Sequence, residues 1–127
     1  MRLWHQELIP RLPRNQLLGQ HRECAALRGG GWGKPHRTVN YVFEYPWTFL
    51  YFYHVLIMDE MERRGFQVDP LWRTPIYRGK TWPAWPKDQA PRELMTEFPL
   101  IYPEHDEAYL QECLDNLKGK GIDLSLE

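Results

Sequence analysis

The segment PWTFLYFYHVLIMDEMERRGF, residues 46–66, decides the fold that we expect. Apolar side chains recur through it at helical spacing, and in its first half they cover most of the helix circumference. Pro46 suits the first turn of a helix, and Gly65 suits the position just after the last turn. Two arginines stand in that last turn, where positive charge is favoured. We therefore expect a central, buried helix from about residue 46 to residue 64.

Two further helices are expected, one on each side of this segment in the sequence. Residues 14–28 carry an apolar stripe and stop at three consecutive glycines, residues 29–31. Residues 106–118 carry a second stripe, and we expect Gly119 to end that helix. The fold class is therefore mainly α.

The segments between these helices have weaker patterns. Residues 1–12 are expected to be extended or irregular, because two prolines prevent a long helix. Residues 38–43 have the composition of a strand, or they simply lead into the next helix. Residues 66–90 are the least regular stretch, and a short helix is expected to begin at Pro91. The result is a helical domain with long ordered loops.

Length and composition are those of one globular domain. The chain has 127 residues, of which 43% are hydrophobic and 26% are charged. Cys24 and Cys113 are too few for a disulfide framework or a four-cysteine zinc site, so we expect core thiols. There is no apolar run of membrane-spanning length, and the start MRLWHQELIP lacks the features of a signal peptide. We expect a cytoplasmic protein.

Charge is unevenly distributed along the chain, although the net charge is only −1. Residues 1–42 hold seven basic side chains and two acidic ones, a net charge of +5, and the remainder carries −6. A basic first third permits a face that binds a polyanion. The overall balance argues against a protein that coats nucleic acid without specificity.

The residues with catalytic potential lie in this basic third. Glu23 is the only acid between Glu7 and Glu44, and it directly follows Arg22. Such a carboxylate can serve as a structural ion pair, a surface charge or a general base, and the residues alone leave these three roles open.

Metal and cofactor sites are not expected. The five histidines include no pair at the i, i+4 spacing of a helical zinc site, and no CxxC accompanies them. His54 lies on an apolar helix stripe, which favours a hydrogen-bonded core residue. The chain also lacks GxSxG, P-loop and GxGxxG motifs, so hydrolase, NTPase and dinucleotide-binding functions have no support.

The tryptophans allow two interpretations. Trp4, Trp32 and Trp72 are candidates for stacking on nucleic-acid bases or for packing. Trp82 and Trp85 alternate with prolines, which favours a packing cluster beneath a loop.

Four stretches, taken in order, resemble one known family. They are LPRNQLLGQHRE (residues 12–23), HRTVNYVF (36–43), ERRGF (62–66) and YPEHDEAYLQECLDNL (102–117). The set resembles the pyrimidine-dimer DNA glycosylase family, of the small endonuclease V type that excises UV photoproducts. The start MRLW also resembles cellular members of this group. No single stretch is specific, but the colinear set is.

This resemblance implies a fold and a chemistry. The family fold is a compact, mainly helical single domain whose N-terminus lies between helices. The nucleophile is the α-amino group of the first residue, which attacks C1′ of the damaged nucleotide and forms an imine. Because Arg2 is too large for the preceding methionine to be removed, the reactive amine is expected to be that of Met1, with Glu23 assisting strand cleavage.

The resemblance also implies a partner and its contacts. The partner is double-stranded DNA that contains a damaged base, bound by a protein that is expected to be a monomer without a cofactor. The expected DNA-binding residues are the basic side chains and histidines of the first third: Arg2, Arg11, Arg14, His21, Arg22, Lys34, His36 and Arg37.

Two other functions remain open. One is a nucleic-acid-binding module that kept the fold and lost the chemistry. The other is a protein-interaction domain whose acidic C-terminal part binds a basic partner. The first predicts DNA binding without a covalent imine, and the second predicts no affinity for DNA at low salt.

Overall fold

The computed structural model describes residues 2–30, 40–80, 83–85 and 101–124. These residues form helices and connecting segments, and none of them is in a β-strand. The 3-10 helices are η1 (Gln6–Arg11), η2 (Asn40–Glu44) and η3 (Pro70–Arg73), and the α-helices are α1 (Arg14–Arg28), α2 (Trp47–Arg63) and α3 (Glu107–Gly119). The expected helical fold is confirmed.

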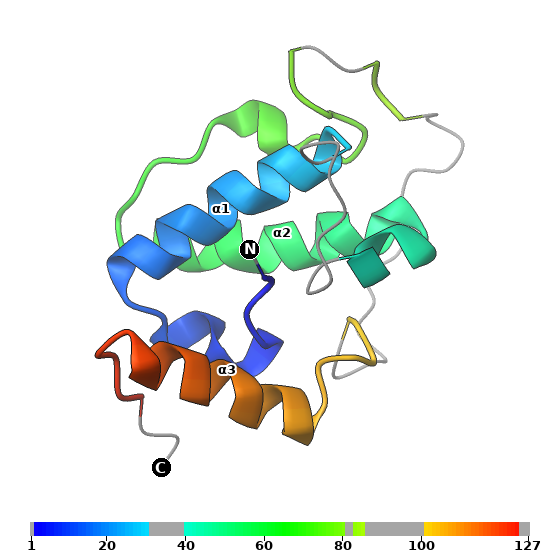
Figure 1. Cartoon of the computed structure of the whole chain (residues 1–127). Helices are drawn as coiled ribbons and strands as arrows, with labels where there is room; N and C mark the ends of the chain where they lie inside the picture. Colours follow the sequence, from blue (N-terminus) through cyan, green and yellow to red (C-terminus); the bar gives the residue numbers. More distant parts are fainter. Residues whose placement is uncertain (1, 31–39, 81–82, 86–100, 125–127) are drawn as a thin grey trace.

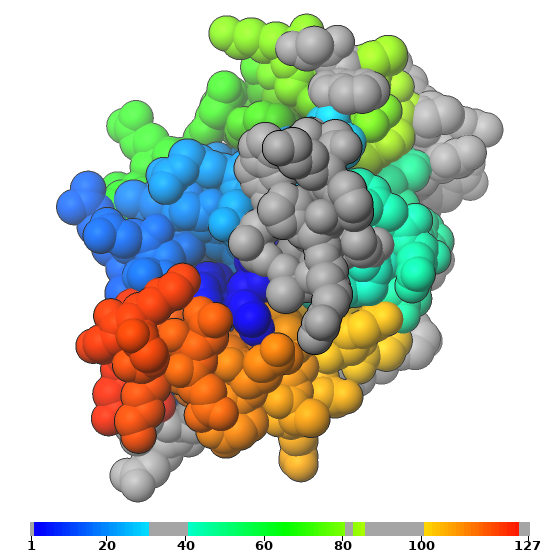
Figure 2. Space-filling model, in the orientation of Figure 1, coloured from blue at the N-terminus to red at the C-terminus, as the bar shows by residue number. Residues whose placement is uncertain are grey.

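Helices α1 and α2 lie side by side, and α3 crosses below them (Figure 1). The first described residues run between this pair and α3, and in the space-filling view they are visible in dark blue between α1 and α3 (Figure 2). The core forms where the helices meet, around fully buried side chains such as Leu17, Cys24, Tyr53 and Ile57. Burial of each such apolar side chain contributes about 1.5–3 kcal/mol.

The two longest helices follow their local sequence signals. α1 begins and ends at the expected residues, and Gly29 is its C-cap. α2 begins one residue after Pro46, and Gly65 adopts a φ of +92°, a left-handed conformation that favours glycine. Cys24 and Cys113 are buried free thiols, as expected.

One expectation about the N-terminal segment was wrong. Residues 6–11 form a 3-10 helix instead of an irregular segment, and the Nδ1 atom of His5 caps it by accepting a hydrogen bond from the Glu7 amide at 3.1 Å. The last helix ends within one residue of its expected end. Gly119 is the last residue of α3, and the left-handed turn that favours glycine lies at Gly121, where φ is +82°.

Some expectations concern residues outside the described part of the chain. These include the helix expected at Pro91, the last of the three glycines expected to stop the helix of residues 14–28, and the side chains of Trp32 and Trp82. Residues 38–43 were expected to form a strand or to lead into the next helix, and those of them that the structure describes, 40–43, belong to the 3-10 helix η2.

The other tryptophans pack against protein groups. Trp85 stacks on Trp47 with a ring-centre distance of 4.5 Å, which confirms the packing interpretation for Trp85. Trp4 is only 6% exposed, so packing also describes it better than base stacking. The Trp72 ring is half-buried and packs edge-on against Tyr77.

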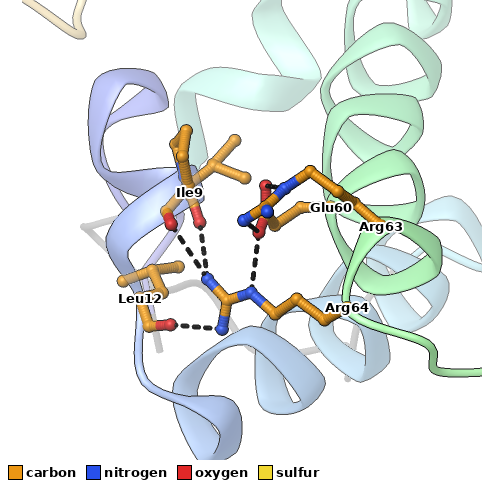
Figure 3. A network of polar contacts seen from close by, with 6 residues as sticks. Ile9, Leu12, Glu60, Arg63 and Arg64 are labelled. Atoms are coloured by element: carbon orange, nitrogen blue, oxygen red, sulfur yellow. Dashed lines mark hydrogen bonds and ion pairs between the residues drawn. The ribbon is translucent and has the colours of Figure 1, made fainter.

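A polar clamp fastens η1 to the end of α2 (Figure 3). Arg64 donates hydrogen bonds to the carbonyls of Leu12 at 2.6 Å and Pro10 at 3.1 Å. Glu60 accepts a hydrogen bond from Arg64 at 2.7 Å and two more from Arg63. Burial alone would raise the pKa of Glu60, but these hydrogen bonds outweigh it and lower the pKa. The clamp fixes the connection that leads from η1 into α1.

No helix in the described ranges combines the length and apolarity of a membrane span.

Candidate active site

The first residues of the chain are held by side chains from three helices. Gln20 on α1 accepts a hydrogen bond from the Trp4 amide at 2.6 Å, and Tyr53 on α2 donates to the Trp4 carbonyl. Tyr109 on α3 donates to the carbonyl of Leu3. The main chain here has no sheet or helix of its own, so these side chains satisfy its buried polar groups. We call residues 2–5 the N-terminal arm.

Gln20 also connects the arm to Glu23. Its amide nitrogen donates to the Arg2 carbonyl at 3.0 Å and to a carboxylate oxygen of Glu23 at 2.7 Å. A glutamine amide has two N–H donors, and both are used here. Its oxygen accepts from Trp4 and lies 2.9 Å from the Tyr53 hydroxyl. One buried side chain therefore ties the beginning of the chain to the carboxylate.

Glu23 occupies an environment that favours its protonated form. Burial is the largest influence and raises the pKa of the carboxyl above its ordinary value. The positive charges of the chain's α-amino group and Lys120 oppose this shift, followed by the hydrogen bond from Gln20. Because the pKa remains raised, the ionised carboxylate is a stronger base than an ordinary glutamate.

Two cations lie against the indole ring of Trp4 in the N-terminal arm. The Lys120 ammonium stands 5.3 Å from the centre of the Trp4 ring, and the Arg2 guanidinium lies 5.9 Å from the same ring. Arg2 also lies over the Tyr109 ring at 5.8 Å and is 3.8 Å from the Glu112 carboxylate. Of these two cations, Lys120 acts on Glu23, because its positive charge lowers the pKa of that carboxyl.

The comparison with known proteins gives this arrangement a family. The family model described as pyrimidine dimer DNA glycosylase matches residues 1–74, which is more than half of the chain. The chain belongs to this family. No curated protein and no solved structure matches the chain detectably. The family is one of DNA-repair glycosylases that act on damaged DNA, and the matched region contains the N-terminal arm, Gln20, Glu23 and Tyr53.

The predicted site residues of this family member fall into four groups. Arg2 and Glu23 meet at the arm, through Gln20. Arg22 is exposed on the outer face of α1, with its guanidinium 3.6 Å from where a Cβ of Gly19 would lie. Met1, Lys34, His36 and Arg37 lie outside the described residues.

The other predicted contacts are more distant from the arm. Arg11 is exposed at the end of η1, and Arg14 is exposed at the start of α1 with its guanidinium 5.6 Å from the Phe66 ring centre. His21 is half-buried on α1. Because successive helical residues are about 100° apart, His21 and Glu23 lie on opposite flanks of Arg22.

Four residues of the site were missed from the sequence: Gln20, Tyr53, Tyr109 and Lys120. Gln20 stands three residues before Glu23, a spacing that places two side chains on one helix face, so this signal was available. The other three come from α2, from the first turn of α3 and from the C-cap of α3, and no local pattern marks them. In the described part of the chain, no group of three or more His, Cys, Asp or Glu side chains could hold a metal ion.

Proposed function

We propose that the protein is a DNA glycosylase with AP-lyase activity on UV-induced pyrimidine dimers or related base lesions. The nucleophile is the α-amino group of Met1, and Glu23 is the acid–base residue. One observation carries this proposal: the Gln20 amide binds both the Arg2 carbonyl and the Glu23 carboxylate. Because neighbouring Cα atoms are about 3.8 Å apart, the amine that precedes Arg2 starts one residue from this junction.

An α-amino group suits this role at neutral pH. Its pKa is near 7.7–8.0, whereas that of a lysine is near 10.4, so roughly one α-amine in ten is neutral at pH 7 against fewer than one lysine in a thousand. The neutral form is the nucleophile.

The chemistry proceeds in balanced steps. The amine lone pair forms a bond to C1′ of the damaged nucleotide, and the bond from C1′ to the base breaks, so the base leaves with that electron pair and takes up a proton. The sugar ring then opens between C1′ and O4′ to give an imine. Glu23 accepts a proton from C2′, the C3′–O3′ bond breaks, and the 3′ phosphate leaves. Water finally hydrolyses the imine and restores the amine.

The DNA must be held and opened for this reaction. A base inside a duplex has to be extruded before it can react, and a dimerised or unpaired base costs less to extrude. Arg22 on the outer face of α1 and the predicted basic residues of the first third would neutralise phosphates. Lys120 adds a cation to the same side of the arm as Glu23.

Borohydride trapping tests the proposal, because borohydride reduces an imine to a stable amine. The protein is incubated with a duplex that carries one abasic site and, separately, with a UV-irradiated duplex. We expect a covalent adduct that mass spectrometry maps to residue 1, and the substrate that traps better identifies the preferred lesion. An added residue before Met1 should abolish trapping without lowering the melting temperature.

Variants test the part played by the carboxylate. Glu23→Gln should retain DNA binding and lose strand cleavage by roughly 10²-fold or more, the usual range for a general base. Glu107→Gln, at an exposed acid on α3, is the matched control and should behave as wild type. DNA binding with no adduct on either duplex would refute the enzyme proposal and favour the non-catalytic module. An adduct that maps to a lysine would refute the role of Met1.

A further inference from the structure

A second polar network lies on the flank of α1 opposite Glu23. At its centre is Arg28, whose side chain is completely buried. Its guanidinium donates hydrogen bonds to the carbonyls of Trp72, Thr74 and Tyr77, each at 2.8 Å. The same guanidinium lies 3.0 Å from Nδ1 of His54. No carboxylate among the described residues forms an ion pair with it, so its remaining partner is an imidazole.

The hydrogen bonds of this network run in one direction. A guanidinium can only donate, so Nδ1 of His54 must accept and the proton of this ring is on Nε2. That Nε2 atom lies 2.7 Å from Nδ1 of His21, which must in turn accept. His21 therefore carries its own proton on Nε2. Adding a proton to either ring would place two N–H groups face to face, so the chain holds both imidazoles neutral.

Burial and the nearby positive charges lower the pKa of both rings, which also favours their neutral forms. Burial lowers the pKa of His54 well below its ordinary value, and the charges of Arg28 and Arg73 lower it further. Burial likewise lowers the pKa of His21, joined by the charges of Arg28 and Arg22. The opposing group is the Asp69 carboxylate at the start of η3. Trp72 contributes an uncharged ring edge against His21.

The outer end of the network faces the expected DNA-binding surface. His21 is only half-buried, and its Nε2 atom has no hydrogen-bond partner among the described residues. It stands one residue before Arg22, on the flank of the outer face of α1. A directed N–H donor beside an exposed arginine suits an oxygen of a phosphate group.

We propose that Arg28 and His54 are positioning residues that hold His21 as a neutral N–H donor to a phosphate of DNA lying across α1. This proposal rests on the DNA-binding role given above and does not require catalysis. Its consequence is specific. An ordinary histidine binds phosphate more tightly as the pH falls through about 6.5, because it gains a charge. His21 contributes a hydrogen bond that does not strengthen between pH 8 and pH 6.

Two measurements on the full chain test this proposal. Long-range ¹H–¹⁵N NMR of the histidine rings reports the tautomers directly, and we expect the Nε2–H form for His21 and His54, unchanged from pH 8 to pH 6. A proton on Nδ1 of His21, or a charged ring at pH 7, would overturn the proposal. This readout is independent of DNA and of turnover.

DNA affinity supplies the second measurement, by fluorescence anisotropy on an abasic duplex at constant ionic strength. His21→Phe should weaken binding by roughly 10- to 150-fold, the value of one hydrogen bond to a charged acceptor, whereas His21→Gln keeps an N–H donor and should bind nearly as wild type. His54→Leu frees His21 to titrate, so the ratio of its affinity to that of wild type should rise on acidification from pH 8 to pH 6. His54→Gln can still bridge Arg28 and His21, so its affinity ratio to wild type should not change with pH.

The outcomes separate this proposal from the catalytic one. Equal binding by wild type and His21→Phe refutes the phosphate contact even if trapping succeeds. An affinity ratio to wild type that does not change with pH, for a folded His54→Leu variant, refutes the positioning role. Failure of borohydride trapping with the His21 results intact refutes only the proposed chemistry.

Discussion

The most informative single substitution is Gln20→Met, which preserves size and helix propensity while it removes the polar junction of the site. In the structure, Gln20 is 1% exposed and pairs with the amide of Trp4, the carbonyl of Arg2 and the carboxylate of Glu23. A thioether side chain can replace none of these hydrogen bonds. Buried main-chain groups of the arm would then lose their partners.

The expected cost follows from those groups. Each buried donor or acceptor left unpaired costs about 1–3 kcal/mol, and the Arg2 carbonyl is only part-buried, so the total is about 2–4 kcal/mol. Native domains have about 5–15 kcal/mol of stability, so the variant still folds. With an unfolding entropy of about 2.1 cal/mol/K per residue, the melting temperature should fall by roughly 8–15 °C.

The effect on activity should exceed the effect on stability. A shift of about 1 Å in a reacting group can cost 10²-fold in rate, and here the chain start loses its link to Glu23. We therefore expect trapping on the abasic duplex to slow by roughly 10²-fold at a temperature where the variant is fully folded.

Calorimetry and trapping kinetics on the same preparation check both expectations. Gln67→Met, at an exposed position after α2, is the control and should change stability by no more than about 0.5 kcal/mol. A melting temperature within a few degrees of wild type would refute the hydrogen-bond account. A large loss of stability with an unchanged trapping rate would refute the view that Gln20 positions the amine.

Two more predictions concern individual charges. The pKa of Glu23 is raised on folding, so the folded state binds more protons than the unfolded state. The ionised carboxyl therefore destabilises the fold at pH values above its unfolded pKa. Glu23→Gln should raise the melting temperature at pH 7, and this gain should disappear near pH 4. An advantage that persists unchanged at pH 4 would contradict this linkage. Arg64→Met should lower the free energy of unfolding, measured in urea, by about 1–3 kcal/mol, because the carbonyls of Leu12 and Pro10 lose their donor. Arg63→Met removes a guanidinium that binds only Glu60, so it should cost less than half as much. Equal losses for the two arginines would show that the clamp to η1 contributes little.

Much of the fold could be predicted because its signals are local. The apolar stripe of residues 14–28, the glycines after it, and the proline before α2 all act within a few residues, and the structure has helices there. The end of α3 is also marked locally. Gly119 is its last helical residue, and the chain reaches positive φ two residues later at Gly121.

The site could be predicted only in part. Glu23 came from the resemblance to the family, and Gln20 shares its helix face at a readable spacing. Arg28 shows the limit of charge counting: it contributes to the basic first third in the sequence, yet it is buried against carbonyls of residues 72–77 and presents no charge to a ligand.

The sequence by itself determined where the three α-helices lie, because helix signals act within a few residues. It also determined the family to which the chain belongs, because colinear stretches of sequence can be compared without knowledge of the fold. Only the tertiary structure decided what those helices hold. The contacts that fix the arm join Trp4 to Tyr53 and Leu3 to Tyr109, and the network of His21 joins α1 to α2 and to η3. These pairs are far apart in the chain. Each forms because a buried main-chain or imidazole group needs a hydrogen-bond partner once water is excluded, and the packing of the helices decides which side chain is that partner.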